Sequence, residues 1–277
     1  LEKARALMDL PALRVEIAAG RAAGRLLGLG LAVTVEFTAS GPAIYGAAGV
    51  PVAATDTVVA TLEPTGEVIA QASITEIGQG ITGVLAQVLA DAVGVAPEAV
   101  RVEAGDTAAA PHGGGAWASR GAAIGGEAAW GAGRALRAQL LEAAGALLQS
   151  GPETLDIREG VVTDASGVPR MTLAELGRTL LFRGHEMPAG VTPGLTAAFH
   201  YRREGDATLA NNGVHAALVE IDDETGIVRV LRYWMIGDCG RVLNPLLVDG
   251  QYRGGVATVN GEALLEACRY DSESGQF

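Results

Sequence analysis

The sequence predicts an α+β fold built from antiparallel hairpins with packed helices. Two pairs of strand-like segments, within residues 57–74 and 214–236, are each joined by a tight turn, so the strands of each pair are expected to run antiparallel. Apolar residues at helical spacing over residues 82–93 follow the first pair. No internal repeat is found along the 277 residues.

Helical and strand-like patterns alternate through the first half of the chain. Asp9 is a plausible helix cap, and Pro11 is tolerated in a first helical turn. Gly94 is expected to end the helix that begins at Thr82. In chain order we predict a helix over 2–27, a strand over 29–38, an irregular loop over 39–54, a hairpin from 57–62 and 67–74, a helix over 82–93, a strand over 100–103, a glycine-rich loop over 111–115 and a helix over 122–149.

The helix predicted over 122–149 contains several interior glycines. Each costs about 1 kcal/mol relative to alanine, and close packing against another backbone is one reason to keep them. The second half of the chain is predicted to hold strands over 155–164 and 196–203, a short helix over 173–180, a hairpin from 214–221 and 227–236, and a final helix over 249–265.

The composition describes an ordered protein with an aliphatic core. Hydrophobic residues make up 49% of the chain and aromatic residues 4%, while the 39 glycines fall mostly between periodic segments. A net charge of −12 makes a nucleic acid an unfavourable partner, because phosphate backbones are repelled. No apolar run reaches the roughly 20 residues that a membrane span needs.

Cysteine and histidine usage gives no sign of a protein-bound metal. His112, His185, His200 and His215 lack metal-ligand spacing. The only two cysteines, Cys239 and Cys268, are too few for a disulfide framework, and we expect Cys239 to be a buried structural thiol.

The run Gly78-Gln79-Gly80-Ile81-Thr82-Gly83 lies between a predicted strand and a predicted helix. Glycines allow close backbone approach, and a helix start offers free N–H groups to an anion or a polar heterocycle. The run also fits the dinucleotide pattern G-x-G-x-x-G, with Asp106 near the position of a ribose-binding acid. A nicotinamide dinucleotide site and a purely structural glycine turn both remain open at this point.

A second candidate is Trp117-Ala118-Ser119-Arg120-Gly121, which directly precedes a predicted helix. Small residues with exposed N–H groups, one Ser and one Arg suit an anionic or polar ligand. A Ser N-cap beside a surface Arg explains the same residues without a ligand.

Taken in order, six motifs resemble the large subunit of the molybdenum hydroxylases, the family of xanthine dehydrogenase, aldehyde oxidoreductase and aerobic carbon monoxide dehydrogenase. The motifs are Thr75–Gly80, Ala86–Asp91, Gly105–Thr107, Ala118–Arg120, Val219–Asp222 with Thr225-Gly226, and Asp238–Gly240 through Asn244-Pro245 to Gly250-Gln251. The resemblance covers nearly the whole chain. It implies the fold of a molybdopterin-binding domain that is incomplete at both ends, with residues 1–50 closing a first domain and linker and residues 51–277 forming a second domain.

The resemblance also implies roles for particular residues. Gly78, Gln79 and Gly80 are expected at the pterin and its molybdenum end. Donors to the pterin or its pyrophosphate are expected from Ala118, Ser119, Arg120 and Gly121, and Gln251 is expected to reach the cofactor again. The cofactor's dithiolene holds the metal in this family, so no protein ligand is needed. The implied cofactor is molybdopterin, in its cytosine dinucleotide form, with molybdenum.

The implied reaction is hydroxylation of an aldehyde or heteroaromatic small molecule, or oxidation of carbon monoxide, with water as the oxygen source. The implied partners are the remaining large-subunit segments, an iron–sulfur subunit with 2Fe–2S clusters and a flavin subunit with FAD. We expect a bacterial cytoplasmic protein, with the periplasm as the alternative.

The sequence departs from the family pattern in three respects. The N-terminal region that supplies the family with another cofactor loop and the substrate loop is expected to be missing. Thr258-Val259-Asn260 replaces the usual Gln-Gly run, and the Glu that serves the family as general base is expected downstream, so no catalytic residue is assigned to this chain. Two other functions therefore stay open: a non-catalytic cofactor-binding or scaffold module, and a nicotinamide dinucleotide-binding domain.

Overall fold

A computed structural model describes residues 1–189, 191, 194–204 and 208–277. Two compact units are present: unit 1 combines Leu1–Phe37 with Ala210–Phe277, and unit 2 is Thr38–Leu209. Unit 1 joins the two ends of the chain because the N-terminal strand pairs with a strand far along the chain. The mixture of helices with mainly antiparallel sheets confirms the α+β class.

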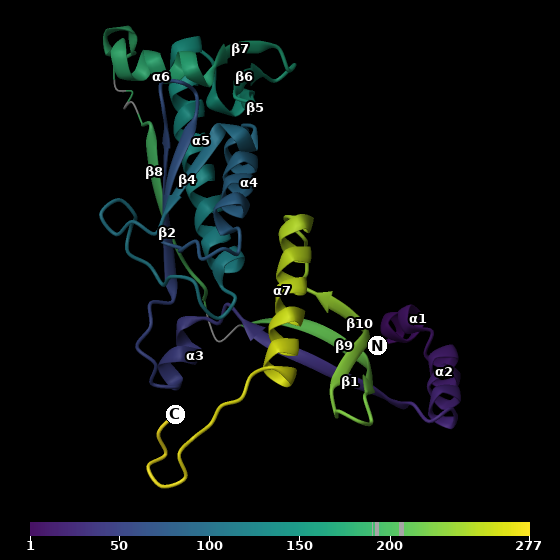
Figure 1. Ribbon diagram of the computed structural model, residues 1–277. Helices are drawn as coiled ribbons and strands as arrows, with labels where there is room; N and C mark the ends of the chain where they lie inside the picture. The colour runs from purple at the N-terminus through teal and green to yellow at the C-terminus, as the bar shows by residue number, and fades with distance from the viewer. Residues whose placement is uncertain (190, 192–193, 205–207) are drawn as a thin grey trace. The chain divides into compact units, whose positions relative to one another are not determined.

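Unit 1 is a three-stranded sheet with helices (Figure 1). Its strands lie in the order β1-β9-β10, and β9 and β10 pair antiparallel as predicted. The elements are α1 Glu2–Met8, α2 Leu10–Ala22, β1 Leu26–Thr38, β9 Leu209–Ile221, β10 Val228–Asp238 and α7 Pro245–Leu264.

The single helix predicted over residues 2–27 is wrong in two respects. Asp9 adopts a left-handed backbone with φ 43°, which breaks the segment into α1 and α2, and its side chain accepts from the N–H of Ala12 at 3.5 Å. Helix α2 ends at Ala22, where the residues that follow enter β1. The core of unit 1 is formed by Ala4, Met8, Leu13, Ile17, Leu27, Ala216 and Leu218.

The main sheet of unit 2 has the strand order β4-β3-β2-β8. Strands β2 Thr55–Leu62, β3 Val68–Ala72 and β8 Thr196–Arg202 pair antiparallel, whereas β3 and β4 Val100–Ala104 pair parallel. Helix α4 Ile81–Val93 is the crossover that a parallel pair needs. The antiparallel pairing predicted for the two hairpins is confirmed, and the parallel pairing of β3 with β4 was not predicted.

Helix α5, Gly126–Leu148, packs against α4 and against the sheet (Figure 1). A π-helical turn over Gly121–Gly125 precedes it. A Cβ on Gly133 would lie 2.6 Å from the Cβ of Ala92 on α4, and a Cβ on Gly131 would meet the Phe199 ring at 2.2 Å. This confirms close packing as the reason for these interior glycines.

The strand predicted over residues 155–164 is instead a hairpin. Glu159 and Gly160 have φ values of 48° and 76°, which reverse the chain between β5 Leu155–Arg158 and β6 Val161–Asp164. Strand β7 Pro169–Thr172 completes this small sheet, and α6 Leu173–Phe182 follows. The loop predicted over 39–54 contains the short helix α3, Pro42–Ala47. Among the described residues, no helix is both long and apolar enough to cross a membrane.

Candidate cofactor-binding site

The two glycine-containing turns singled out in the sequence lie side by side in unit 2. Gly121 opens the π-helical turn before α5, and a Cβ there would lie 3.1 Å from Cδ1 of Ile81, the first residue of α4. Helices α4 and α5 also pack along their length. The residues predicted at Gly78–Gly80 and at Ala118–Gly121 are therefore brought together by one helix pair.

Glu76 organises the first turn, and sequence analysis gave it no separate role. Its Oε1 accepts from the N–H groups of Gly78 and Gly80 at 2.8 and 3.0 Å, and its Oε2 accepts from the N–H and hydroxyl of Thr82, both at 3.1 Å. The expectation of free N–H groups is therefore wrong for these three residues. A carboxylate placed just before a helix start was the available signal, because acids cap N–H groups there.

The same contacts set the acidity of Glu76. Burial raises the pKa of its carboxyl, but hydrogen bonds from Thr82, Gly80 and Gly78 outweigh burial, and the net pKa lies below its usual value. Glu76 is therefore ionised at neutral pH and already occupies the anion position at the start of α4.

Gln79 is held by its own turn. Its Oε1 accepts from the N–H of Ile77 at 2.7 Å, and its Nε2 donates to the carbonyl of Thr75 at 2.9 Å. A carboxamide has two N–H donors and two acceptor lone pairs, so these bonds use half of its capacity. The turn thus fixes the orientation of an amide that can still bind a ligand.

The second turn presents backbone to the surface. Ala118 and Ser119 are exposed and have φ values of 47° and 51°, a left-handed conformation that is uncommon for residues other than glycine. Arg120 follows in the right-handed region with φ −90° and ψ −13°. A left-handed residue before a right-handed one turns successive N–H groups toward one side. One of these groups, the N–H of Arg120, already donates to the carbonyl of Trp117 at 3.3 Å.

Arg120 faces the interior of unit 2. Its side chain is 2% exposed and pairs with Asp56, which is fully buried, through a 2.7 Å contact between Nη2 and Oδ2. Its Nη1 donates to the carbonyl of Gly115 at 2.9 Å. The guanidinium therefore supports the turn from beneath and presents no donor at its surface, in contrast to the role expected from the resemblance.

Asp56 gathers further donors around this ion pair. Its Oδ1 accepts from the Ser73 hydroxyl at 2.8 Å and from the N–H of Gly114 at 3.2 Å. Burial raises the pKa of Asp56, and Arg120, Ser73 and Gly114 oppose that rise. A Cβ on Gly113 would lie 2.2 Å from the Ser73 hydroxyl, and one on Gly114 would lie 2.2 Å from Nη1 of Arg120. Only glycine lets the loop cover the buried pair.

The other residues considered in the sequence belong to different elements. Gln251 and the run Thr258-Val259-Asn260 are on α7, which has no buried residue and belongs to unit 1. Cys239 is exposed, so its assignment as a buried thiol is wrong. Among the described residues, no group of three or more His, Cys, Asp or Glu could hold a metal ion.

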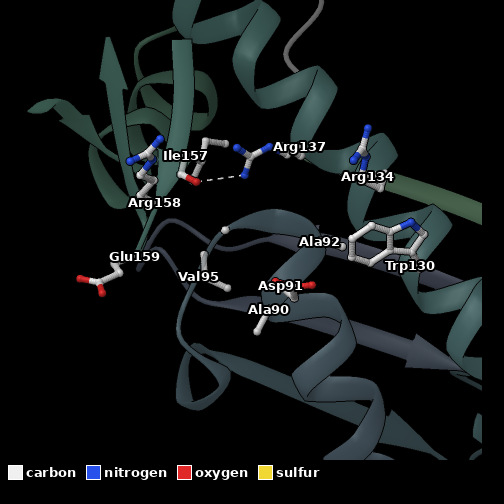
Figure 2. Close-up of a pocket in the computed structure, with 11 residues that line it drawn as sticks. Ala90, Asp91, Ala92, Val95, Trp130, Arg134, Arg137, Ile157, Arg158 and Glu159 are labelled. Atoms are coloured by element: carbon white, nitrogen blue, oxygen red, sulfur yellow. Dashed lines mark hydrogen bonds between the residues drawn. The ribbon is translucent and has the colours of Figure 1, made fainter. Parts of the chain in front are cut away.

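A separate pocket of about 430 Å³ lies at the other end of α4 (Figure 2). Trp130, Arg134 and Arg137 line it together with residues 90–92, 94–95 and 157–159. Arg137 donates to the carbonyls of Val93 and Ile157 at 2.6 and 3.0 Å, so it ties α5 to the small sheet. Because α4 rises about 18 Å along its length, this pocket is distinct from the paired turns.

Comparison with known proteins identifies the family. A family model described as the molybdopterin cofactor-binding domain matches residues 3–277. This chain belongs to that family. It is the molybdopterin-binding part of a molybdenum hydroxylase large subunit, as the resemblance predicted.

The family's members give the scale of the match. The chain is 33% identical over 267 residues to the nicotine 6-hydroxylase large subunit of Paenarthrobacter nicotinovorans, covering 96% of this chain and 32% of that protein. It is 32% identical over 283 residues to the carbon monoxide dehydrogenase large chain of Hydrogenophaga pseudoflava, covering 99% and 34%. The structure of quinoline 2-oxidoreductase from Pseudomonas putida 86 superposes with a TM-score of 0.86 at 35% identity, over 98% of this chain and 34% of that one. The molybdopterin-binding chain thus spans about a third of the length of these relatives.

The paired turns fit the family's ligand. Gly78 has a φ of 101°, and a Cβ there would meet nothing within 4 Å, so its outer side is open. Beside it, Gln79 offers a fixed amide, and Ala118 and Ser119 offer exposed backbone. An elongated polar ligand lying across both turns would meet donors from each.

Proposed function

We propose that this chain is the molybdopterin-binding part of an oxidoreductase that hydroxylates aldehydes or heteroaromatic compounds, or oxidises carbon monoxide. The oxygen would come from water. The proposal depends on the adjacency of the two turns, where Gly121 packs against Ile81. Because the turns are adjacent, a single ligand can contact hydrogen-bond donors from both motifs. The bound cofactor would supply the redox chemistry, and the protein would orient it. Gly78–Gly80 would lie at the molybdenum end, and Ala118, Ser119 and Gly121 would bind the pterin or its pyrophosphate.

The same proposal extends to parts outside these residues. The cofactor would be the cytosine dinucleotide form, and electrons would leave through 2Fe–2S clusters to FAD on other domains or subunits. One relative, 31% identical over 267 residues, is named the gamma subunit of a 6-hydroxypseudooxynicotine dehydrogenase complex. We propose a comparable multi-subunit assembly in the bacterial cytoplasm for this protein, with residues 1–50 and 51–277 serving as the end of one cofactor-binding domain and the body of the next.

A nicotinamide dinucleotide site remains as a second candidate because β3, α4 and β4 form a parallel β-α-β crossover. In such a site the pyrophosphate binds at the helix start. Here the Glu76 carboxylate occupies those N–H groups, and its negative charge would repel a phosphate. This contact favours the molybdopterin assignment. Titration of the purified protein with NADH distinguishes the two.

The test uses two variants at positions with nearly equal φ angles. A β-branched residue is poorly tolerated where φ is positive, so we compare Ala118→Val with Glu159→Val, whose φ values are 47° and 48°. Each variant of the complete protein, purified with its partners, is analysed for molybdenum and pterin per polypeptide. The proposal expects both variants to unfold at lower temperature but only Ala118→Val to lose cofactor. Full cofactor content in Ala118→Val would reject the proposed role of this turn.

The same analysis separates the proposed enzyme from a scaffold module. A scaffold would retain cofactor binding without turnover. The complete protein is therefore assayed with an aldehyde, a purine and carbon monoxide. Bound molybdenum with no oxidation of any of these classes would favour the scaffold.

A further inference from the structure

We propose that an apolar strip on β1 is covered by apolar side chains from another part of the same large-subunit polypeptide, outside these 277 residues. The strip consists of Leu31, Val33, Val35 and Phe37, whose side chains are 57%, 62%, 60% and 69% exposed. The inference rests on the proposed function, because that proposal makes the chain one part of a longer subunit.

The strip continues the core face of its own strand. Alternate residues of a strand point to one face, so these four side chains share a face with Leu27 and Leu29. Leu27 is buried in the core of unit 1, and Leu29 packs against that core. A Cβ on Gly28 would approach Val219, and one on Gly213 would approach Thr34. These two contacts place β1 beside β9 both near its start and near its end.

Unit 1 buries the beginning of this face and leaves the rest open. The core residues from α1 and α2, which include Met8 and Ile17, gather with Leu27 at the start of β1. Along the remainder of the strand, every residue from 30 to 37 is exposed. Strand β1 is also an edge of its sheet, with β9 as its one partner in the order β1-β9-β10. An exposed, long, apolar edge strand is a strong candidate for pairing with other chain segments.

The chemistry of the strip favours a permanent neighbour. All four residues are aliphatic or aromatic, and permanent interfaces resemble a domain core, whereas transient interfaces are more polar. The relatives that match nearly all of this chain are about three times as long, since it covers 32% and 34% of them. A segment of the same polypeptide meets the strip as the subunit folds, so the strip need not remain exposed before assembly.

The experiment places a photo-crosslinking residue on the strip in the complete, assembled protein. Val33→p-benzoylphenylalanine and Phe37→p-benzoylphenylalanine are prepared separately, and Glu224→p-benzoylphenylalanine in the β9–β10 turn is the control. After irradiation, electrophoresis separates crosslinks within the large subunit from those that add another chain's mass. Mass spectrometry then identifies the joined peptide.

At both strip positions, the inference expects that the large subunit gains no mass from another chain. It also expects the crosslinked peptide to come from the large subunit outside these 277 residues. A joined peptide from another subunit, from a second copy or from residues 38–209 would overturn it, as would failure to crosslink or the same peptide from Glu224. Molybdenum is measured in the same preparations. A complex without molybdenum that crosslinks as expected would reject the proposed function while leaving the covered strip in place.

Discussion

The ion pair between Arg120 and Asp56 shows how one buried contact shapes the candidate site. The two residues are 64 positions apart in the sequence and fully or almost fully buried. Breaking a buried pair leaves one charge without compensation, which is strongly destabilising. The pair therefore fixes the loop that leads into Ala118 and Ser119, although neither charge reaches the surface of the turn.

Replacement of Arg120 should be costly. We expect Arg120→Met to lower the free energy of unfolding by about 3–5 kcal/mol, because the Asp56 carboxylate stays buried without its cation. The matched control is Arg101→Met, which removes an exposed ion pair with Glu103 and should cost less than about 1 kcal/mol. Urea unfolding of both variants provides the measurement. Similar losses in the two variants would contradict this account of Arg120.

Glu76 should make the first turn sensitive to acid. Because its folded-state pKa lies below the usual value, its contribution to stability is fully present above about pH 4.3 and is lost as the pH falls through the folded-state pKa. We expect Glu76→Gln to be less stable than the wild type at pH 7, with a gap that narrows below pH 4. Thermal unfolding across this range measures the gap. A constant gap at all pH values would mean that ionisation of Glu76 does not hold the turn.

The packing of α4 against α5 sets the spacing of the two turns at the scale of elements. Gly133 lies where a Cβ would crowd Ala92, whereas a Cβ on Gly126, in the same helix, would meet nothing within 4 Å. The two glycines therefore have different packing environments, although nothing in the sequence alone distinguishes them. Only Gly133 permits the close approach of the helices.

This difference predicts opposite effects of one substitution. Gly133→Ala should destabilise the protein by about 1–3 kcal/mol through overpacking, despite the better helix propensity of alanine. Gly126→Ala should stabilise it by about 0.4–1 kcal/mol, because its φ of −62° suits alanine. Melting temperatures of the two variants give the comparison. If Gly133→Ala also stabilised the protein, the helices would not be in close contact at this position.

At the scale of the whole molecule, the two units differ in how many apolar side chains they bury. The core of unit 1 consists of seven residues among those that the structure describes, and α7 contributes none of them. Leu246 and Leu265, at the two ends of α7, are 79% and 87% exposed. Unit 2 surrounds a larger core between its sheet and the pair α4 and α5. Unit 1 thus has the character of a part that depends on neighbours for burial.

We expect the isolated 277-residue chain, supplied with molybdopterin cofactor, to show no sustained turnover. No carboxylate in the sequence matches the family's base, and a positioned base contributes about 10²–10⁴-fold in rate. Two cysteines cannot supply the four ligands of an iron–sulfur cluster. The assay uses an aldehyde, a purine and carbon monoxide with an artificial electron acceptor. Sustained oxidation of any substrate would show that the chain carries its own base.

The sequence by itself determined the features that depend on neighbouring residues. Residues 214–236 form the predicted hairpin, and the helix predicted over 82–93 ends at Gly94. Turn chemistry and apolar spacing act over a few residues, so a single sequence displays them directly. The ordered motifs identified the family for the same reason, since each is short and continuous.

Only the tertiary structure decided the contacts between distant segments. Pairing of β1 with β9 and the parallel pairing of β3 with β4 join residues whose separation no local pattern encodes. The burial of Arg120 on Asp56 changed its expected role from a ligand donor to a support, because an Arg in a short motif carries no sign of which way it will point. Burial and partner are properties of the packed chain. Local sequence therefore predicted where the turns begin, while long-range packing decided which of their groups face a ligand.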